Sequence, residues 1–94
     1  MDIKEYLEIN YNGLLELARS GKKYCCAKDI SEYLDSDPNT IRAAAKASPK
    51  EIGFATVSLG KRLCIPIIPF IEVMSGASFE AIAETILSSK KGSE

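Results

Sequence analysis

The stretch DSDPNTIRAAAKASP, residues 35–49, decides the fold because it holds a turn, a helix start and a helix stop in succession. It opens on a cluster of turn-forming residues, in which Ser36 or Asp37 can cap a helix. Pro38 suits the first helical position, where its missing N–H has no intrahelical partner. The alanine triplet favours a helix, and the second proline ends it. We therefore predict a helix from Pro38 to about Ala47.

A shorter helical pattern precedes this turn. Between Ala27 and Leu34, apolar or small side chains recur at the spacing of one helix face. We expect Ile41, Ala44 and Ala45 of the second helix to pack against this face. Two short helices joined by a three-residue turn form the helix-turn-helix motif, whose second helix enters the major groove of DNA.

A β-hairpin is predicted after the second helix. Apolar and polar side chains alternate over residues 55–59, and a second short strand follows over residues 62–65. Gly60-Lys61 supplies the tight turn, because glycine tolerates a positive φ. Pro66 ends the pairing, since proline has no N–H to donate. This hairpin is the predicted wing beside the helix pair.

Helical patterns flank this centre on both sides. Residues 3–18 are helical in pattern, Pro69 can open another helix, and Ser78 can cap the last one. The stripes of the first and last helices either complete a small core or make a homodimer contact. The side chains expected to face inward after the hairpin are Phe70, Ile71, Val73 and Met74, then Phe79, Ile82, Ala83, Ile86 and Leu87.

The order of these elements predicts one domain over residues 1–94, mainly α-helical with a small β-hairpin. A winged helix-turn-helix core spans residues 24–74, with an N-terminal helical extension over residues 1–21 and a C-terminal helix over residues 77–89. No apolar run approaches the roughly 20 residues that span a bilayer. The charged N-terminus does not resemble a signal peptide, so we expect a cytoplasmic protein without membrane contact.

Catalytic chemistry and metal binding find little support. The chain has no histidine and no glycine-rich phosphate loop, so we expect no enzyme activity, no catalytic residue and no cofactor. Cys25, Cys26 and Cys64 lack C-x-x-C spacing, so no metal site is expected. We interpret these cysteines as reduced thiols that act as small hydrophobic residues.

Charge is unevenly distributed along the chain, whose formal net charge is −1. Residues 19–62 carry nine basic and five acidic side chains, whereas the two flanking segments together carry three basic and eight acidic ones. DNA affinity depends on local neutralisation of phosphates rather than on whole-chain charge. The basic middle segment is therefore compatible with a double-stranded DNA partner.

The candidate DNA-binding residues lie on the second helix and on the wing. An asparagine can read adenine in bidentate fashion, and an arginine can read guanine or grip a phosphate. Cations at a hairpin tip can lie on a phosphate ridge or enter a minor groove. The candidates are Asn39, Thr40, Arg42, Ala43, Lys46 and Lys50 on or just after the helix, and Lys61 and Arg62 on the wing.

Several short motifs occur together at characteristic spacing: AKDI at 27–30, DPNTIR at 37–42, IGF at 52–54, GKR at 60–62 and IP at 65–66. With them, the stretch from residue 26 to residue 74 resembles the excisionase-type, MerR-like winged helix-turn-helix domains of phages and mobile elements. The resemblance implies an accessory protein of DNA recombination, which binds and often bends DNA beside an integrase or recombinase. Similar domains serve in phage repressors and small terminase subunits.

The chain departs from that family at three positions. Cys26 stands where the family usually has a serine or threonine cap, and Cys64 and Ile67 stand where it often has basic residues. Cys64, Ile67 and the net acidity of the chain favour a second hypothesis, a protein-interaction module that kept the winged fold. In that hypothesis the apolar run from Cys64 to Ile71 faces a protein partner.

Overall fold

The computed structural model describes residues 2–92, with side chains described to Leu87. Within that range the chain is mainly helical, with a small three-stranded antiparallel sheet. The elements are α1 (Ile3–Asn10), α2 (Asn12–Arg19), β1 (Tyr24–Cys25), α3 (Ala27–Leu34), α4 (Pro38–Ala47), β2 (Val57–Leu59), β3 (Arg62–Pro66), α5 (Ile67–Ser75) and α6 (Phe79–Gly92).

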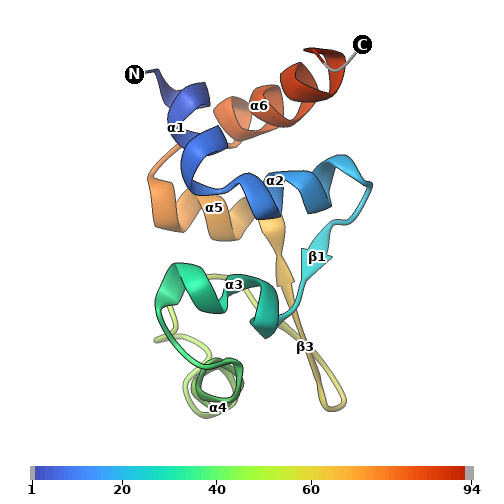
Figure 1. The fold of residues 1–94 in the computed structure, drawn as a ribbon. Helices are drawn as coiled ribbons and strands as arrows, with labels where there is room; N and C mark the ends of the chain where they lie inside the picture. Colours follow the sequence, from blue (N-terminus) through green and yellow to red (C-terminus); the bar gives the residue numbers. More distant parts are fainter. Residues whose placement is uncertain (1, 93–94) are drawn as a thin grey trace.

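The molecule is elongated, with principal extents of 42, 24 and 20 Å. Helices α1, α2, α5 and α6 lie together at one end with both termini, whereas α3, α4 and the tip of the β2–β3 hairpin lie at the other (Figure 1). Strand β3 runs between the two ends and leads directly into α5. The terminal helices are therefore remote from α4.

The hairpin forms with different bounds, and the expectation that Pro66 ends the pairing is wrong, because Pro66 belongs to β3 and pairs with Tyr24 of β1. Its strands β2 and β3 pair as Val57 with Cys64 and Leu59 with Arg62. Gly60, with φ of 62°, occupies the first central position of the two-residue turn, where type II′ geometry needs glycine. Strand β1 was not predicted, because two residues are too short to show alternation; it pairs with the other edge of β3.

The core joins the two ends of the molecule. Leu7, Leu15 and Ile82 are fully buried where α1, α2 and α6 meet, and Ile30 brings α3 into the same cluster. The terminal helices therefore complete the core, which is one of the two roles expected for them. Phe70 lies at the centre, with its ring 5.0 Å from that of Phe54.

The apolar run after the hairpin is part of this core. Ile65, Phe70 and Ile71 are fully buried, and Ile67 is 1% exposed. The hypothesis that this run faces a protein partner is therefore wrong for its largest side chains. Because the Ile67 side chain is buried, this is not a surface position from which a cation could contact DNA.

Helix α5 begins at Ile67, two residues earlier than predicted. Pro66 precedes the helix and Pro69 lies in its first turn, where a proline removes no intrahelical hydrogen bond. Val73 is 54% exposed, so the expectation that it faces inward is wrong. Phe79 and Leu87 of α6 are also exposed, at 56% and 66%, because α6 buries only the narrower stripe that contains Ile82.

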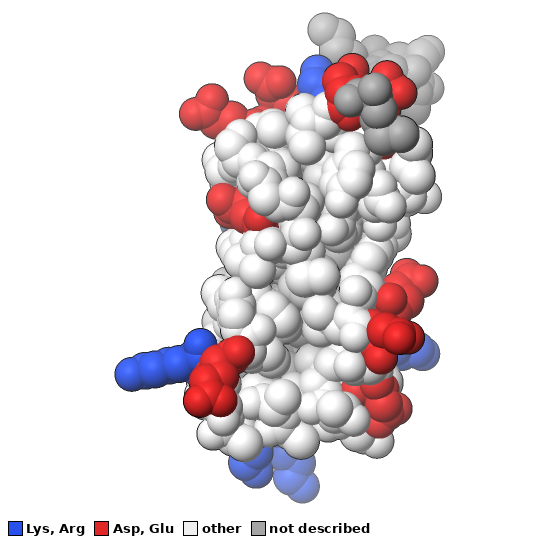
Figure 2. Space-filling model, turned by 90° about the vertical axis from the view of Figure 1, so that its left-hand side faces the viewer, with Lys and Arg blue, Asp and Glu red and all other residues white. Residues whose placement is uncertain are grey.

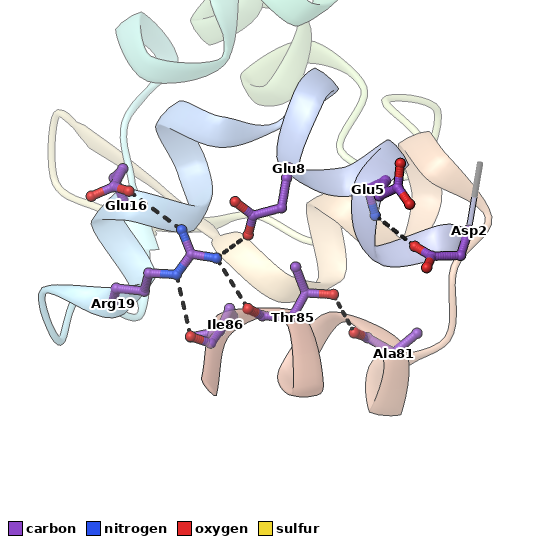
Figure 3. Close-up of polar contacts among 8 residues, drawn as sticks. All are labelled: Asp2, Glu5, Glu8, Glu16, Arg19, Ala81, Thr85 and Ile86. Atoms are coloured by element: carbon purple, nitrogen blue, oxygen red, sulfur yellow. Dashed lines mark hydrogen bonds and ion pairs between the residues drawn. The ribbon is translucent and has the colours of Figure 1, made fainter. Parts of the chain in front are cut away.

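Arg19 forms polar contacts that link α6 to the N-terminal helices (Figure 3). Its side chain is 9% exposed and forms ion pairs with Glu8 of α1 and with Glu16, the latter at 3.3 Å. The guanidinium also donates to the backbone carbonyls of Thr85, at 3.0 Å, and Ile86, at 3.2 Å. One buried cation thus connects α1, α2 and α6.

Candidate nucleic-acid interface

Helices α3 and α4 have the predicted bounds, and a tight turn joins them. Asp35 adopts the left-handed conformation, with φ of 51°, and its N–H donates to the Ser31 carbonyl. Asp37 occupies the N-cap position of α4 with extended backbone, and Pro38 follows at the first helical position. Neither Ser36 nor Asp37 provides a side-chain cap for α4; the Ser36 hydroxyl donates instead to the Leu34 carbonyl.

Helix α4 buries a narrow stripe and exposes the rest. Ile41 and Ala45 are 3% and 4% exposed, whereas Ala44 is exposed, contrary to expectation. Each helical residue turns about 100°, so a single contact with short α3 covers positions four apart and not their neighbours. The predicted DNA-binding side chains of α4 are all exposed, namely Asn39, Thr40, Arg42, Ala43 and Lys46.

Four cations from two elements converge on one hollow of about 430 Å³. We call this hollow the basic cleft; Arg42 and Lys46 line it from α4, and Lys61 and Arg62 line it from the hairpin. No acidic side chain lines it. Among the side chains that the structure describes, none lies in an ion pair with these four cations.

The cations lie at the end of the molecule that carries α4. Figure 2 shows Lys and Arg side chains that project from this end, with acidic side chains on the flanks above it and at the opposite, terminal end. The Arg42 guanidinium also donates to the Asn39 side-chain oxygen at 2.9 Å. Two of the predicted site residues are therefore already linked along the exposed face of α4.

Lys50 is the predicted residue that the structure separates from the others. It follows α4 and lines a different hollow, together with Phe54 and Glu72. Thr40 and Ala43 are exposed but line neither that hollow nor the basic cleft.

Lys22 is a cation that the sequence analysis missed. A neighbouring hollow of about 540 Å³ shares Arg42, Lys61 and Arg62 with the basic cleft and is bounded on its far side by Lys22. The pairing of β1 with β3 brings Lys22 to this position. No pattern in the sequence predicts that pairing, and the adjacent lysines at 22 and 23 were the only local hint of a cation there.

Another hollow lies between the α2–β1 turn, α5 and α6. Its volume is about 590 Å³, and its ionisable lining residues other than Tyr24 are Lys22 and Lys23. Within residues 2–92, no group of three or more His, Cys, Asp or Glu side chains is placed to hold a metal ion. Over the same residues, every helix is too short or too polar to cross a bilayer.

Comparison with known proteins finds no relative of this chain. No family model, no curated protein and no solved structure matches the chain.

Proposed function

We propose that this chain is a winged helix-turn-helix protein that binds double-stranded DNA. In this proposal α4 is the recognition helix and the β2–β3 hairpin is the wing. The observation that carries the proposal is the basic cleft, in which four cations without acidic partners face one hollow from both elements. Cations arranged in this way neutralise phosphates and release counterions, which supplies most of the affinity for a duplex.

The roles of the individual side chains follow from their positions. Arg42 and Lys46 flank the outer face of α4, so they reach phosphates or base edges when α4 enters the major groove. Asn39 is near the N-terminus of α4, the end that contacts bases, and it exchanges its hydrogen bond with Arg42 for one with an adenine. Lys61 and Arg62 hold the adjoining backbone from the wing.

The resemblance to excisionase-type domains supports a more specific role. In that role the protein assists site-specific recombination in a phage or mobile element, beside an integrase or recombinase. Repressor and small terminase functions use the same recognition helix, so DNA binding is the property common to all three. The protein-interaction alternative has lost its main support, because the apolar run around Phe70 lies in the core.

A salt titration of duplex binding tests the proposal. Fluorescence anisotropy with labelled DNA from beside the gene, and with an unrelated competitor, gives the affinity at each salt concentration. Arg42→Ala should weaken binding to every duplex by about tenfold, and by more if Arg42 also reads a base. The double variant Lys61→Ala/Arg62→Ala should reduce the salt slope by about two, without changing the preferred sequence.

The unsubstituted protein provides the decisive control. Its affinity should fall steeply between low and physiological salt, as expected for several phosphate contacts. Undetectable binding at low salt, or unchanged binding by Arg42→Ala, contradicts the proposal.

A further inference from the structure

The ladder between β1 and β3 ends one residue before Cys26, and its register, continued by one position, places Cys26 opposite Cys64. Tyr24 pairs with Pro66 and Cys25 pairs with Ile65. The Ile67 N–H donates to the Lys23 carbonyl at 3.0 Å, which continues the same register. Continued one position in the other direction, the register matches Cys26 with Cys64, and the Cys26 backbone is still extended, with φ of −110° and ψ of 173°.

The two thiols share the outer face of the sheet. Side chains alternate between faces along a strand, and Cys25 and Ile65 are both buried toward the core. Cys26, which is exposed, and Cys64, which is half-buried, therefore lie on the opposite face. Both line the hollow of about 540 Å³ beside the basic cleft.

The spacing of this pair suits a disulfide. Hydrogen-bonded pairs alternate along an antiparallel ladder, and the bond at Lys23 and Ile67 makes Cys26 and Cys64 a non-hydrogen-bonded pair. The Cα atoms of such pairs lie about 4.5 Å apart, within the range that disulfides bridge. Rotation about the Cys26 Cα–Cβ bond turns the sulfur toward Cys64 and away from Asp29, whose carboxylate lies 3.2 Å from it.

The surroundings favour reaction with an anionic reagent. Lys22, Arg42, Lys61 and Arg62 line the same hollow, against one carboxylate, that of Asp29. Positive surroundings concentrate anions, and the reacting group in thiol–disulfide exchange is the deprotonated thiol. Cys25 differs, because burial raises the pKa of its thiol to about 12 and keeps it protonated at neutral pH.

We propose that Cys26 and Cys64 form a reversible intramolecular disulfide by exchange with glutathione disulfide, an anionic low-molecular-weight disulfide. The Cys26 thiolate attacks one glutathione sulfur, which forms a mixed disulfide and releases one glutathione thiolate. The Cys64 thiolate then attacks the Cys26 sulfur, forms the protein disulfide and releases the second glutathione. Two electrons pass from the protein to glutathione disulfide, and the two thiol protons end on the two released glutathiones.

This proposal gives Cys26 and Cys64 a different role from the one that the sequence indicated. Cys26 and Cys64 are accessible reactive groups rather than small hydrophobic residues, and the link joins the start of α3 to β3. Disulfides in a reducing compartment are generally transient or redox-sensing, which suits a reversible bond. Formation of the bond does not depend on DNA binding.

Intact-mass spectrometry of the full chain tests the proposal. The protein is incubated, at low concentration to limit dimers, with defined mixtures of reduced glutathione and glutathione disulfide. We expect the mass to fall by that of two hydrogens and dithiothreitol to restore it. Cys26→Ser and Cys64→Ser should each stop at a single glutathione adduct, whereas the matched control Cys25→Ala should still lose two hydrogens.

Three outcomes overturn the proposal. They are a wild-type protein that stops at glutathione adducts, a bond that disappears in Cys25→Ala, and a disulfide found only between two chains. Circular dichroism of each variant shows that it is folded, so a missing disulfide cannot be assigned to unfolding.

Discussion

The conformation of Asp35 determines where α3 ends and α4 begins. Among the described residues, Asp35 is the non-glycine residue with a positive φ, and this conformation ends α3 so that α4 begins three residues later. Aspartate tolerates the left-handed region better than most residues, because its short polar side chain bonds locally. The N–H groups of Asp35 and Ser36 both donate to the Ser31 carbonyl, which closes the end of the helix.

Asp35→Val should therefore destabilise the fold by about 1–2 kcal/mol, because a β-branched residue is strained in the left-handed region. Urea unfolding followed by circular dichroism measures this loss. Asp35→Asn is the matched control and should change stability by less than about 0.5 kcal/mol, since asparagine accepts the same conformation. Equal losses in both variants would show that the carboxylate, and not the backbone, matters.

The attachment of α6 shows how one side chain organises whole elements. Arg19 links carboxylates of α1 and α2 to backbone carbonyls of α6, and its side chain is nearly buried (Figure 3). Its removal deletes the hydrogen bonds to α6 and leaves the Glu8 and Glu16 carboxylates without their cation. Glu8 and Glu16 are 36% and 65% exposed, so solvent screens part of that interaction.

Arg19→Met, which keeps an unbranched apolar stem but removes the guanidinium, should lower the free energy of unfolding by about 1–3 kcal/mol. The control is Glu84→Gln, which breaks the exposed pair that Glu84 forms with Lys4 at 3.9 Å. That pair should contribute less than about 1 kcal/mol. Thermal or urea unfolding compares the two, and a loss in Glu84→Gln as large as in Arg19→Met would contradict a special role for the buried guanidinium.

At the scale of the whole molecule, the terminal helices and the basic cleft lie at opposite ends of a molecule 42 Å long (Figure 1). Acidic side chains occur at the terminal end and also on the flanks of the end that carries α4 (Figure 2). Ionic screening has a Debye length of about 8 Å at physiological salt. The acids of the terminal helices therefore oppose the cations of the cleft weakly, despite a formal net charge of −1.

The extent of the proposed DNA footprint can be tested by two lysines, one on each side of α4 in the sequence. Lys22 bounds the hollow next to the basic cleft, whereas Lys50 lines a hollow that includes Glu72. Lys22→Ala should lower the salt slope of DNA binding by about one and weaken affinity severalfold. Lys50→Ala removes the same charge and should have the smaller effect; the reverse order would place the duplex on the other side of α4.

Local signals were sufficient for the elements at the centre of the fold. The bounds of α3 and α4 and the turn at Gly60 were predicted because helix periodicity, proline placement and glycine conformation act within a few residues. The exposure of Arg42 also follows from helix periodicity once Ile41 is inside. The DNA-binding role itself stays a prediction.

Contacts between distant segments had no such signal. The sequence by itself determined which segments are helical, where they turn and which charges they carry, since those depend on neighbours in the chain. Only the tertiary structure decided that Lys22 joins the hairpin cations, that Cys26 and Cys64 line one hollow and that the run around Phe70 is core. These outcomes depend on strand register and on how helices share a small interior, which are set by packing between residues far apart in the chain.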